Sequence, residues 1–142
     1  MKSIYDWHKK VYTTKLDKKH PICPFAAKAK FKISTESVYH ELRNWDNTYD
    51  LVIVDHQQYL TVEFAEQLED TYCKVRDDVV VLLEHFENPG FINGVFTGCG
   101  DKKILFLLQN KSKLEEAKMI LQKSNYYENY PQEYLEKLWK NR

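Results

Sequence analysis

Three uninterrupted apolar runs limit what this chain can fold into. They span Leu51–Val54, Val79–Leu83 and Ile104–Leu108. A strand with one wet face alternates apolar and polar residues, whereas a strand covered on both faces reads as a continuous apolar run. The three runs therefore predict the centre of a β-sheet that carries helices on both faces.

A further strand is predicted before these runs, and a turn is predicted between the last two of them. Ala29, Phe31 and Ile33 alternate with lysines, which is typical of a strand at the edge of a sheet. The glycine-bearing stretch 89–100 predicts a hairpin-like turn with a short strand at 94–97. Amphipathic spacing predicts a first helix over residues 3–14.

Side chains that can cap helix N-termini mark where later helices begin. Ser34 or Thr35 precedes one helix, Thr61 precedes a longer one, and Ser112 opens a capping box. Pro131 is predicted to start a final helix. The residues predicted to face the core are Val38, Leu42 and Trp45 in the first of these helices, and Phe64, Leu68, Tyr72 and Val75 in the second.

Together these elements predict a single α/β domain over residues 1–142, with a mixed sheet of about four strands and helices on both faces. The β-α-β-α-β-β-α order is that of thioredoxin-like folds, and a rearranged ferredoxin-like α+β sandwich accommodates it as well. The likeness to thioredoxins is one of order only. Cys23 precedes the first predicted strand and has no second cysteine three residues away, so we expect no thioredoxin-type redox activity.

Charge and composition exclude several classes of function. Twenty-one basic and twenty-one acidic residues cancel, so we expect no nucleic-acid partner and no binding to membranes. No apolar run approaches the roughly 20 residues of a membrane span, and the first residues lack a signal-peptide pattern, so a cytoplasmic protein is expected. All four glycines lie between residues 90 and 100, away from any Rossmann or P-loop position. We therefore predict no cofactor.

The segment from His20 to Ala26 is the first candidate for chemistry. Pro21 and Pro24 restrict the backbone around Cys23, and a helix starting at Pro24 would favour the Cys23 thiolate. His20 is close enough in sequence to act as its base. We predict Cys23 and His20 as catalytic residues. The alternative is that Cys23 and Phe25 fill the core while the prolines shape a turn.

A family resemblance attaches to the same segment. Cys23-Pro24-Phe25-Ala26, followed by a basic stretch and a strand, resembles the opening of an uncharacterised bacterial domain family that carries a Cys-Pro-Phe-Ala motif near its start. The resemblance covers about the first third of the chain. It implies a shared architecture and no particular activity.

Polar residues that follow the buried strands are the second candidate. Asp55 and His56 come directly after the run 51–54, and ligands of open α/β sheets gather beyond the carboxyl ends of strands. His85 ends the next strand and faces the same crevice if the two strands are parallel. We predict Asp55, His56 and His85 as residues that bind a small molecule. A local Asp–His hydrogen bond in a polar loop is the alternative.

No metal site is predicted. The histidines and cysteines that might be combined into one are His20, Cys23, His56, His85 and Cys99. Structural zinc sites present paired ligands a few residues apart, and only His20 and Cys23 have such a spacing.

Two functions from different classes remain open. One is a small enzyme or thiol-dependent protein that handles a small molecule near Cys23 and His20. The other is a non-catalytic module that forms a homodimer, since aromatic residues are enriched in interfaces. The aromatic residues of the two end segments are Tyr5, Trp7 and Tyr12 at the start, and Tyr126, Tyr127, Tyr130, Tyr134 and Trp139 at the end.

Overall fold

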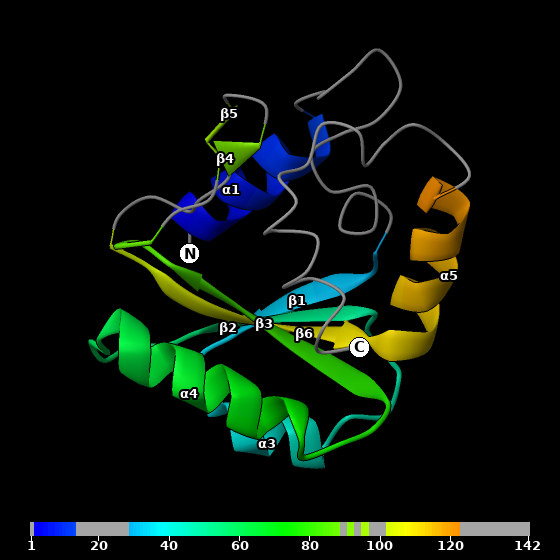
Figure 1. Ribbon diagram of the computed structural model, residues 1–142, viewed down its shortest axis with the longest axis horizontal. Coiled ribbons are helices and arrows are strands. Elements are labelled where there is room, and N and C mark those ends of the chain that lie inside the picture. Colours follow the sequence, from blue (N-terminus) through cyan, green and yellow to red (C-terminus); the bar gives the residue numbers. More distant parts are fainter. Residues whose placement is uncertain (1, 14–28, 89–90, 93–94, 97–101, 123–142) are drawn as a thin grey trace.

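A four-stranded mixed sheet forms the centre of the molecule (Figure 1). The structure is a computed structural model and describes residues 2–13, 29–88, 91–92, 95–96 and 102–122. Across the sheet the order is β1 (Phe31–Ser34), β2 (Leu51–Asp55), β6 (Ile104–Asn110) and β3 (Val79–His85). β1 pairs parallel with β2, and β6 pairs antiparallel with both β2 and β3. The predicted mixed sheet, with the strand at 31–34 on its edge, is confirmed.

Helices and a small hairpin complete the described part of the chain. The helices are α1 (Lys2–Thr13), α3 (Val38–Arg43), α4 (Val62–Cys73) and α5 (Lys111–Gln122), and the hairpin pairs β4 (Phe91–Ile92) with β5 (Val95–Phe96). The order along the chain agrees with the predicted order. The helix predicted from Pro131 lies outside the described residues. The likeness to thioredoxin-like or ferredoxin-like folds stays a prediction.

The sheet is covered on both faces, as the unbroken apolar runs predict. On one face, α3 and α4 pack against alternate residues of β2, β3 and β6, with Phe106 fully buried at the centre of the cluster. On the other face, Ile4 and Trp7 of α1 pack against Ile53 and Leu105. Figure 1 shows α3 and α4 together on one side of the sheet and α1 on the other. All five residues of β2 are buried, because β2 lies between these two clusters.

Two predicted helix caps are wrong and one is confirmed. Ser37 caps α3, since its side chain accepts a hydrogen bond from the N–H of His40. The predicted cap residue Ser34 instead ends β1, where its hydroxyl donates to the buried carboxylate of Glu41. Thr61 caps α4 as predicted, because its hydroxyl accepts from the N–H of Phe64.

The helix α5 begins before the predicted capping box. It starts at Lys111, and the side chain of Asn110 accepts a hydrogen bond from the N–H of Lys113. Asn110 therefore does what Ser112 was predicted to do. The last residue of β6 thus leads directly into the helix, so no loop separates strand from helix here.

The buried side of α4 agrees with the prediction at Leu68 and Tyr72, which pack in the core, and differs from it at Phe64 and Val75. Phe64 is 50% exposed and Val75, beyond the helix end, is 40% exposed, whereas the buried residues are Ala65, Glu69 and Tyr72. Glu69 can be buried because its carboxylate accepts a hydrogen bond from the N–H of Leu83 in β3.

The same helix covers the outer edge of β3. Asp78 and Phe86 bond through their main chains to Lys111 and Lys103, which flank β6. Alternate residues of an antiparallel strand point to opposite sides, so the main-chain groups of Val81 and Leu83 point away from β6. The carbonyl of Val81 accepts a hydrogen bond from the thiol of Cys73, and the N–H of Leu83 donates to Glu69. Side chains of α4 therefore form hydrogen bonds with main-chain groups that, in an edge strand, have no neighbouring strand to pair with.

We expect the substitution Phe106→Ala to lower the free energy of unfolding by about 3–5 kcal/mol, because it leaves a cavity in the larger core cluster. Phe64→Ala removes the same side chain from a position that is half exposed. We expect that variant to stay within about 0.5 kcal/mol of the wild type. Urea unfolding followed by circular dichroism measures both. Similar losses in the two variants would contradict the placement of these rings.

Candidate functional site

The ends of β2 and β3 meet at the same edge of the sheet. Both strands pair antiparallel with β6, so they run in the same direction. Asp55 in β2 and Glu84 in β3 both lie opposite Leu105 of β6. Asp55 and His85 were predicted to lie at one strand-end crevice on the condition that the two strands are parallel. That condition is therefore met.

A buried ion pair occupies this edge. The carboxylate of Asp55 is buried, and Lys103 approaches it with 3.1 Å between Nζ and Oδ2. The Lys103 side chain is 23% exposed, so the cation reaches the carboxylate from the surface. Lys103 comes just before β6 and is 48 residues from Asp55 in the chain. Lys103 was not predicted from the sequence, because no local pattern links it to Asp55.

His56 follows Asp55 and is distinguished by one nitrogen of its ring. Its main-chain N–H donates to the carbonyl of Ile104, which fixes the residue beside the start of β6. Its ring lies edge-on to Phe106, with 6.0 Å between the ring centroids. The Nε2 atom is buried and has no hydrogen-bond partner among the described residues. Burial lowers the pKa of His56 below its usual value, and the charge of Asp55 opposes that shift only in part.

His85 holds main-chain groups on both sides of its ring. It is 3% exposed, and its Nε2 lies 2.6 Å from the carbonyl oxygen of Leu60. Its Nδ1 accepts a hydrogen bond from the N–H of Glu87. A carbonyl can only accept, so Nε2 donates the proton in this hydrogen bond. His85 thereby ties the segment before α4 to the end of β3, and its binding of a ligand stays a prediction.

Cys23 and His20 lie outside the described residues, together with Cys99. The structure therefore does not place the predicted catalytic pair relative to Asp55 and His56. Among the residues that are described, no three histidine, cysteine or acidic side chains gather where they could hold a metal ion.

Of the aromatic residues predicted to form a dimer interface, Trp7 and Tyr5 can be described. Trp7 is 8% exposed and packs within the chain's own core, whereas Tyr5 is 52% exposed. The aromatic residues from 126 to 139 lie outside the described part of the chain. None of its helices is long and apolar enough to cross a membrane.

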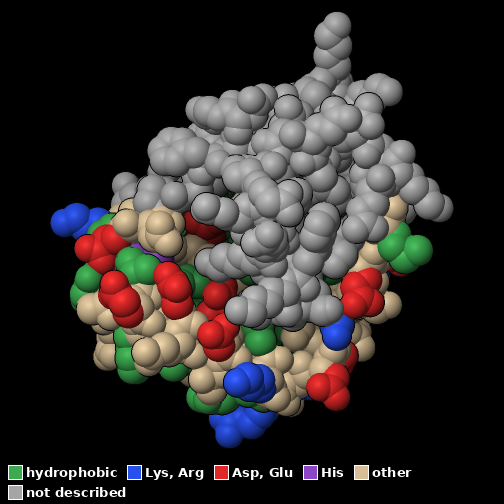
Figure 2. All heavy atoms as spheres, in the orientation of Figure 1, with side chains coloured by type: hydrophobic (Ala, Val, Ile, Leu, Met, Phe, Trp, Pro, Cys, Tyr) green, Lys and Arg blue, Asp and Glu red, His purple; other side chains and the backbone are tan. Residues whose placement is uncertain are grey.

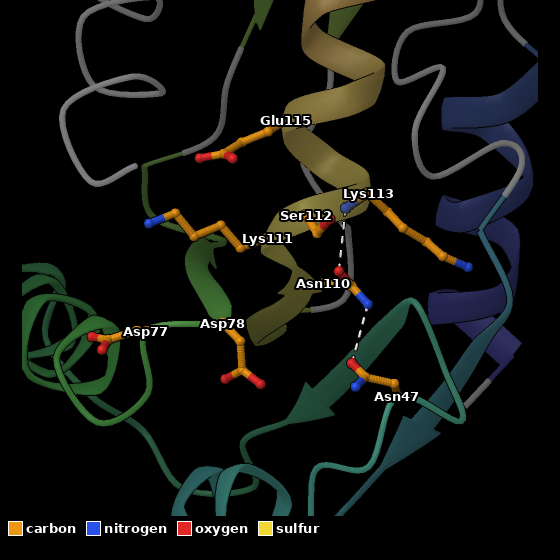
Figure 3. A pocket seen from close by; sticks show the side chains of 8 residues that line it. All are labelled: Asn47, Asp77, Asp78, Asn110, Lys111, Ser112, Lys113 and Glu115. Atoms are coloured by element: carbon orange, nitrogen blue, oxygen red, sulfur yellow. Dashed lines mark hydrogen bonds between the residues drawn. The ribbon is translucent and has the colours of Figure 1, made fainter.

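A shallow hollow of about 460 Å³ lies at the opposite end of the sheet (Figure 3). It is found where β3 begins and β6 passes into α5. Its lining residues are Asn47, Asp77, Asp78, Asn110, Lys111, Ser112, Lys113 and Glu115. The hollow was not predicted from the sequence, because it combines residues from three distant segments.

The polar groups of the hollow largely satisfy one another. The side-chain oxygen of Asn47 accepts hydrogen bonds from the indole N–H of Trp45 and from the side-chain amide of Asn110. Asn47 has a φ of 66°, a conformation that asparagine tolerates better than most residues. Figure 3 shows Asn110 between Asn47 and the start of α5. The bonds therefore join the turn to the helix, which is a structural role.

Two of the charged residues that line the hollow, Asp78 and Lys113, form ion pairs. Arg76 binds Asp78 at 2.8 Å, and Lys113 binds Asp50 at 2.7 Å. The Arg76 guanidinium lowers the pKa of the Asp78 carboxyl by hydrogen bonding. The strand-end edge, with its unsatisfied His56 nitrogen, is therefore the better candidate for a binding site.

Comparison with known proteins adds no assignment: no protein-family model, no curated protein and no solved structure matches the chain. The resemblance carried by the Cys23–Ala26 motif stays a prediction.

Removing the cation at the strand-end edge should destabilise the fold more than removing the anion. Lys103→Met leaves the buried Asp55 carboxylate unpaired, and we expect a loss of about 3 kcal/mol at pH 7. Asp55→Asn leaves a cation that still reaches solvent, and we expect a loss of about 1 kcal/mol. Urea unfolding at pH 7 compares the two. Equal losses, or the reverse order, would contradict a carboxylate buried against a surface cation.

The lowered pKa of His56 should make the fold sensitive to pH. The unfolded chain takes up a proton near pH 6.5, whereas the folded chain takes it up only at lower pH. The free energy of unfolding should therefore fall as pH drops below 6.5 and level off below the folded pKa. His56→Gln should remove this part of the pH dependence, and His40→Gln, on the exposed side of α3, should leave it intact. NMR titration of the His56 ring together with unfolding at several pH values tests this. A His56 pKa at or above 6.5 would contradict it.

Proposed function

We propose that this protein binds a small polar molecule at the edge where β2 and β3 end, with His56 as its central contact. One observation carries the proposal, namely the buried Nε2 atom of His56 that has no partner among the described residues. A buried polar atom without a hydrogen bond costs about 1–3 kcal/mol, so such atoms are uncommon unless they serve a purpose. A ligand group that bonds to Nε2 would offset this cost.

The surroundings of His56 favour a neutral ligand. Lys103 and Asp55 already cancel each other's charge at this edge. The lowered pKa of His56 keeps its ring neutral near pH 7, so Nε2 offers one hydrogen bond without a formal charge. Hydroxyl and carbonyl groups are the natural partners of such a ring. We infer that the ligand presents an alcohol or amide group to His56.

Chemical transformation of the bound molecule is a further step of the same proposal. The groups that the sequence offers for it are Cys23 as nucleophile and His20 as base. They would have to lie beside the strand-end edge in the folded chain. The described residues support binding alone, because Cys23 and His20 lie outside them.

The test is a fragment screen by NMR with the full chain. The probes are small neutral alcohols and amides, added to isotopically labelled protein at pH 7. We expect at least one of them to shift the ring signals of His56 and the main-chain signals of residues 54–57 and 103–105. His56→Phe should abolish these shifts, and His40→Phe should preserve them.

Two outcomes would overturn the proposal. In the first, no probe shifts His56, and a slowly exchanging water molecule at Nε2 accounts for the buried nitrogen. In the second, the shifts map to Asn47 and Asn110, so the hollow at the other end of the sheet is the binding site.

A further inference from the structure

Charge is unevenly distributed along this electrically balanced chain. Eight of the twenty-one acidic residues lie between residues 59 and 87, against two of the twenty-one basic residues, Lys74 and Arg76. In contrast, the first 32 residues contain nine basic and two acidic residues. A total charge of zero therefore conceals a strongly acidic segment that comprises α4 and β3.

Three of these acidic residues lie along α4 and form no ion pair within the described part of the chain. Glu63, Glu66 and Asp70 are three, four and seven residues apart, so they share one side of the helix. Glu63 and Asp70 are exposed and Glu66 is partly exposed. None of the three forms an ion pair with any residue that the structure describes. Figure 2 shows acidic and hydrophobic side chains gathered over the region that α4 occupies in Figure 1.

Two aromatic rings are exposed in the same region. Phe64 in α4 is 50% exposed, and Tyr59 just before the helix is 60% exposed. The Tyr59 hydroxyl donates a hydrogen bond of 2.6 Å to the carboxylate of Glu87. That bond raises the pKa of Tyr59, and the negative charges of Glu87 and Glu63 raise it further. The acidic groups therefore act directly on the ring at the start of α4.

We propose that the outer face of α4, together with Tyr59, docks a lysine- or arginine-rich segment of another protein. Carboxylates without partners form charge-assisted hydrogen bonds with ammonium and guanidinium groups. The faces of aromatic rings attract the same cations. Exposed aromatic residues are also the usual energetic anchors of protein interfaces. Rings and carboxylates together thus fit a basic segment better than an apolar or acidic one.

Several of the cations that the structure describes lie on the other side of the sheet or are engaged elsewhere. α1 lies on the opposite side of the sheet from α4, as Figure 1 shows. Lys32 is engaged by Glu41, and both Lys30 and Lys32 lie over the ring of Tyr49. Lys113 is engaged by Asp50. With these described lysines engaged, the proposal commits to a basic segment of a different protein, and the experiment below distinguishes it from a second copy of this chain.

The experiment uses the full chain and fluorescein-labelled nona-arginine, with nona-glutamate as the negative control. Fluorescence anisotropy at low ionic strength measures the dissociation constant. We expect nona-arginine to bind and nona-glutamate not to bind. We expect the variant Phe64→Ala to weaken binding about tenfold. We expect the same of a double variant that carries Glu63→Gln and Glu66→Gln. A tenfold loss corresponds to losing one good contact.

Matched variants on α5 serve as controls. Met119→Ala removes another exposed apolar side chain, 60% exposed, and Glu115→Gln with Glu116→Gln removes the same two charges from α5. We expect these variants to bind as the wild type does. Equal weakening by the α5 variants would overturn the proposal, because it would show attraction to charge without a defined face.

Two further outcomes would also overturn the proposal. One is the absence of nona-arginine binding to the wild type. The other is self-association of the wild-type chain that Phe64→Ala abolishes, which analytical ultracentrifugation would detect. In that case the occupant of the α4 face is a second copy of this chain.

Discussion

The arrangement of the sheet depends on the antiparallel strand β6. It pairs with β2 on one side and β3 on the other, and its residues are buried against both layers of helices. Because one antiparallel strand separates them, β2 and β3 run in the same direction and end at the same edge. Residues 55–56 and 84–85 are thereby brought within one strand of each other, although about thirty residues of chain separate them. Any site at this edge exists because β6 lies where it does.

The centre of the sheet could be predicted because burial on both faces leaves a local mark. The continuous apolar runs coincide with β2, β3 and β6, and the alternation of Phe31 and Ile33 with lysines coincides with an edge strand. The inward faces of the helices were harder to predict. The inward face of α4 includes Glu69, and a glutamate is expected outside unless a distant partner satisfies it. That partner is a main-chain N–H of β3, which no local pattern reveals.

The candidate site shows the same division between local and distant information. Asp55 and His56 were recognisable because they follow a buried strand. The ion pair with Lys103 and the bond of His85 to the Leu60 carbonyl join residues that are 48 and 25 positions apart in the chain. His85 therefore serves the fold through two main-chain bonds, whereas the described residues supply no hydrogen-bond partner to Nε2 of His56. The two histidines at this edge differ in their partners and not in their chemistry.

The edge of β3 shows how a short helix can take the place of a further strand. A sheet edge normally offers a row of donors and acceptors to any extended segment that approaches it. Here a thiol and a carboxylate from α4 already bond to two of those groups. An incoming strand would have to expel both side chains and bury their polar atoms elsewhere. These two hydrogen bonds thus oppose the addition of a further strand beside β3. In this way α4 limits the width of the sheet, while its outer side is left exposed.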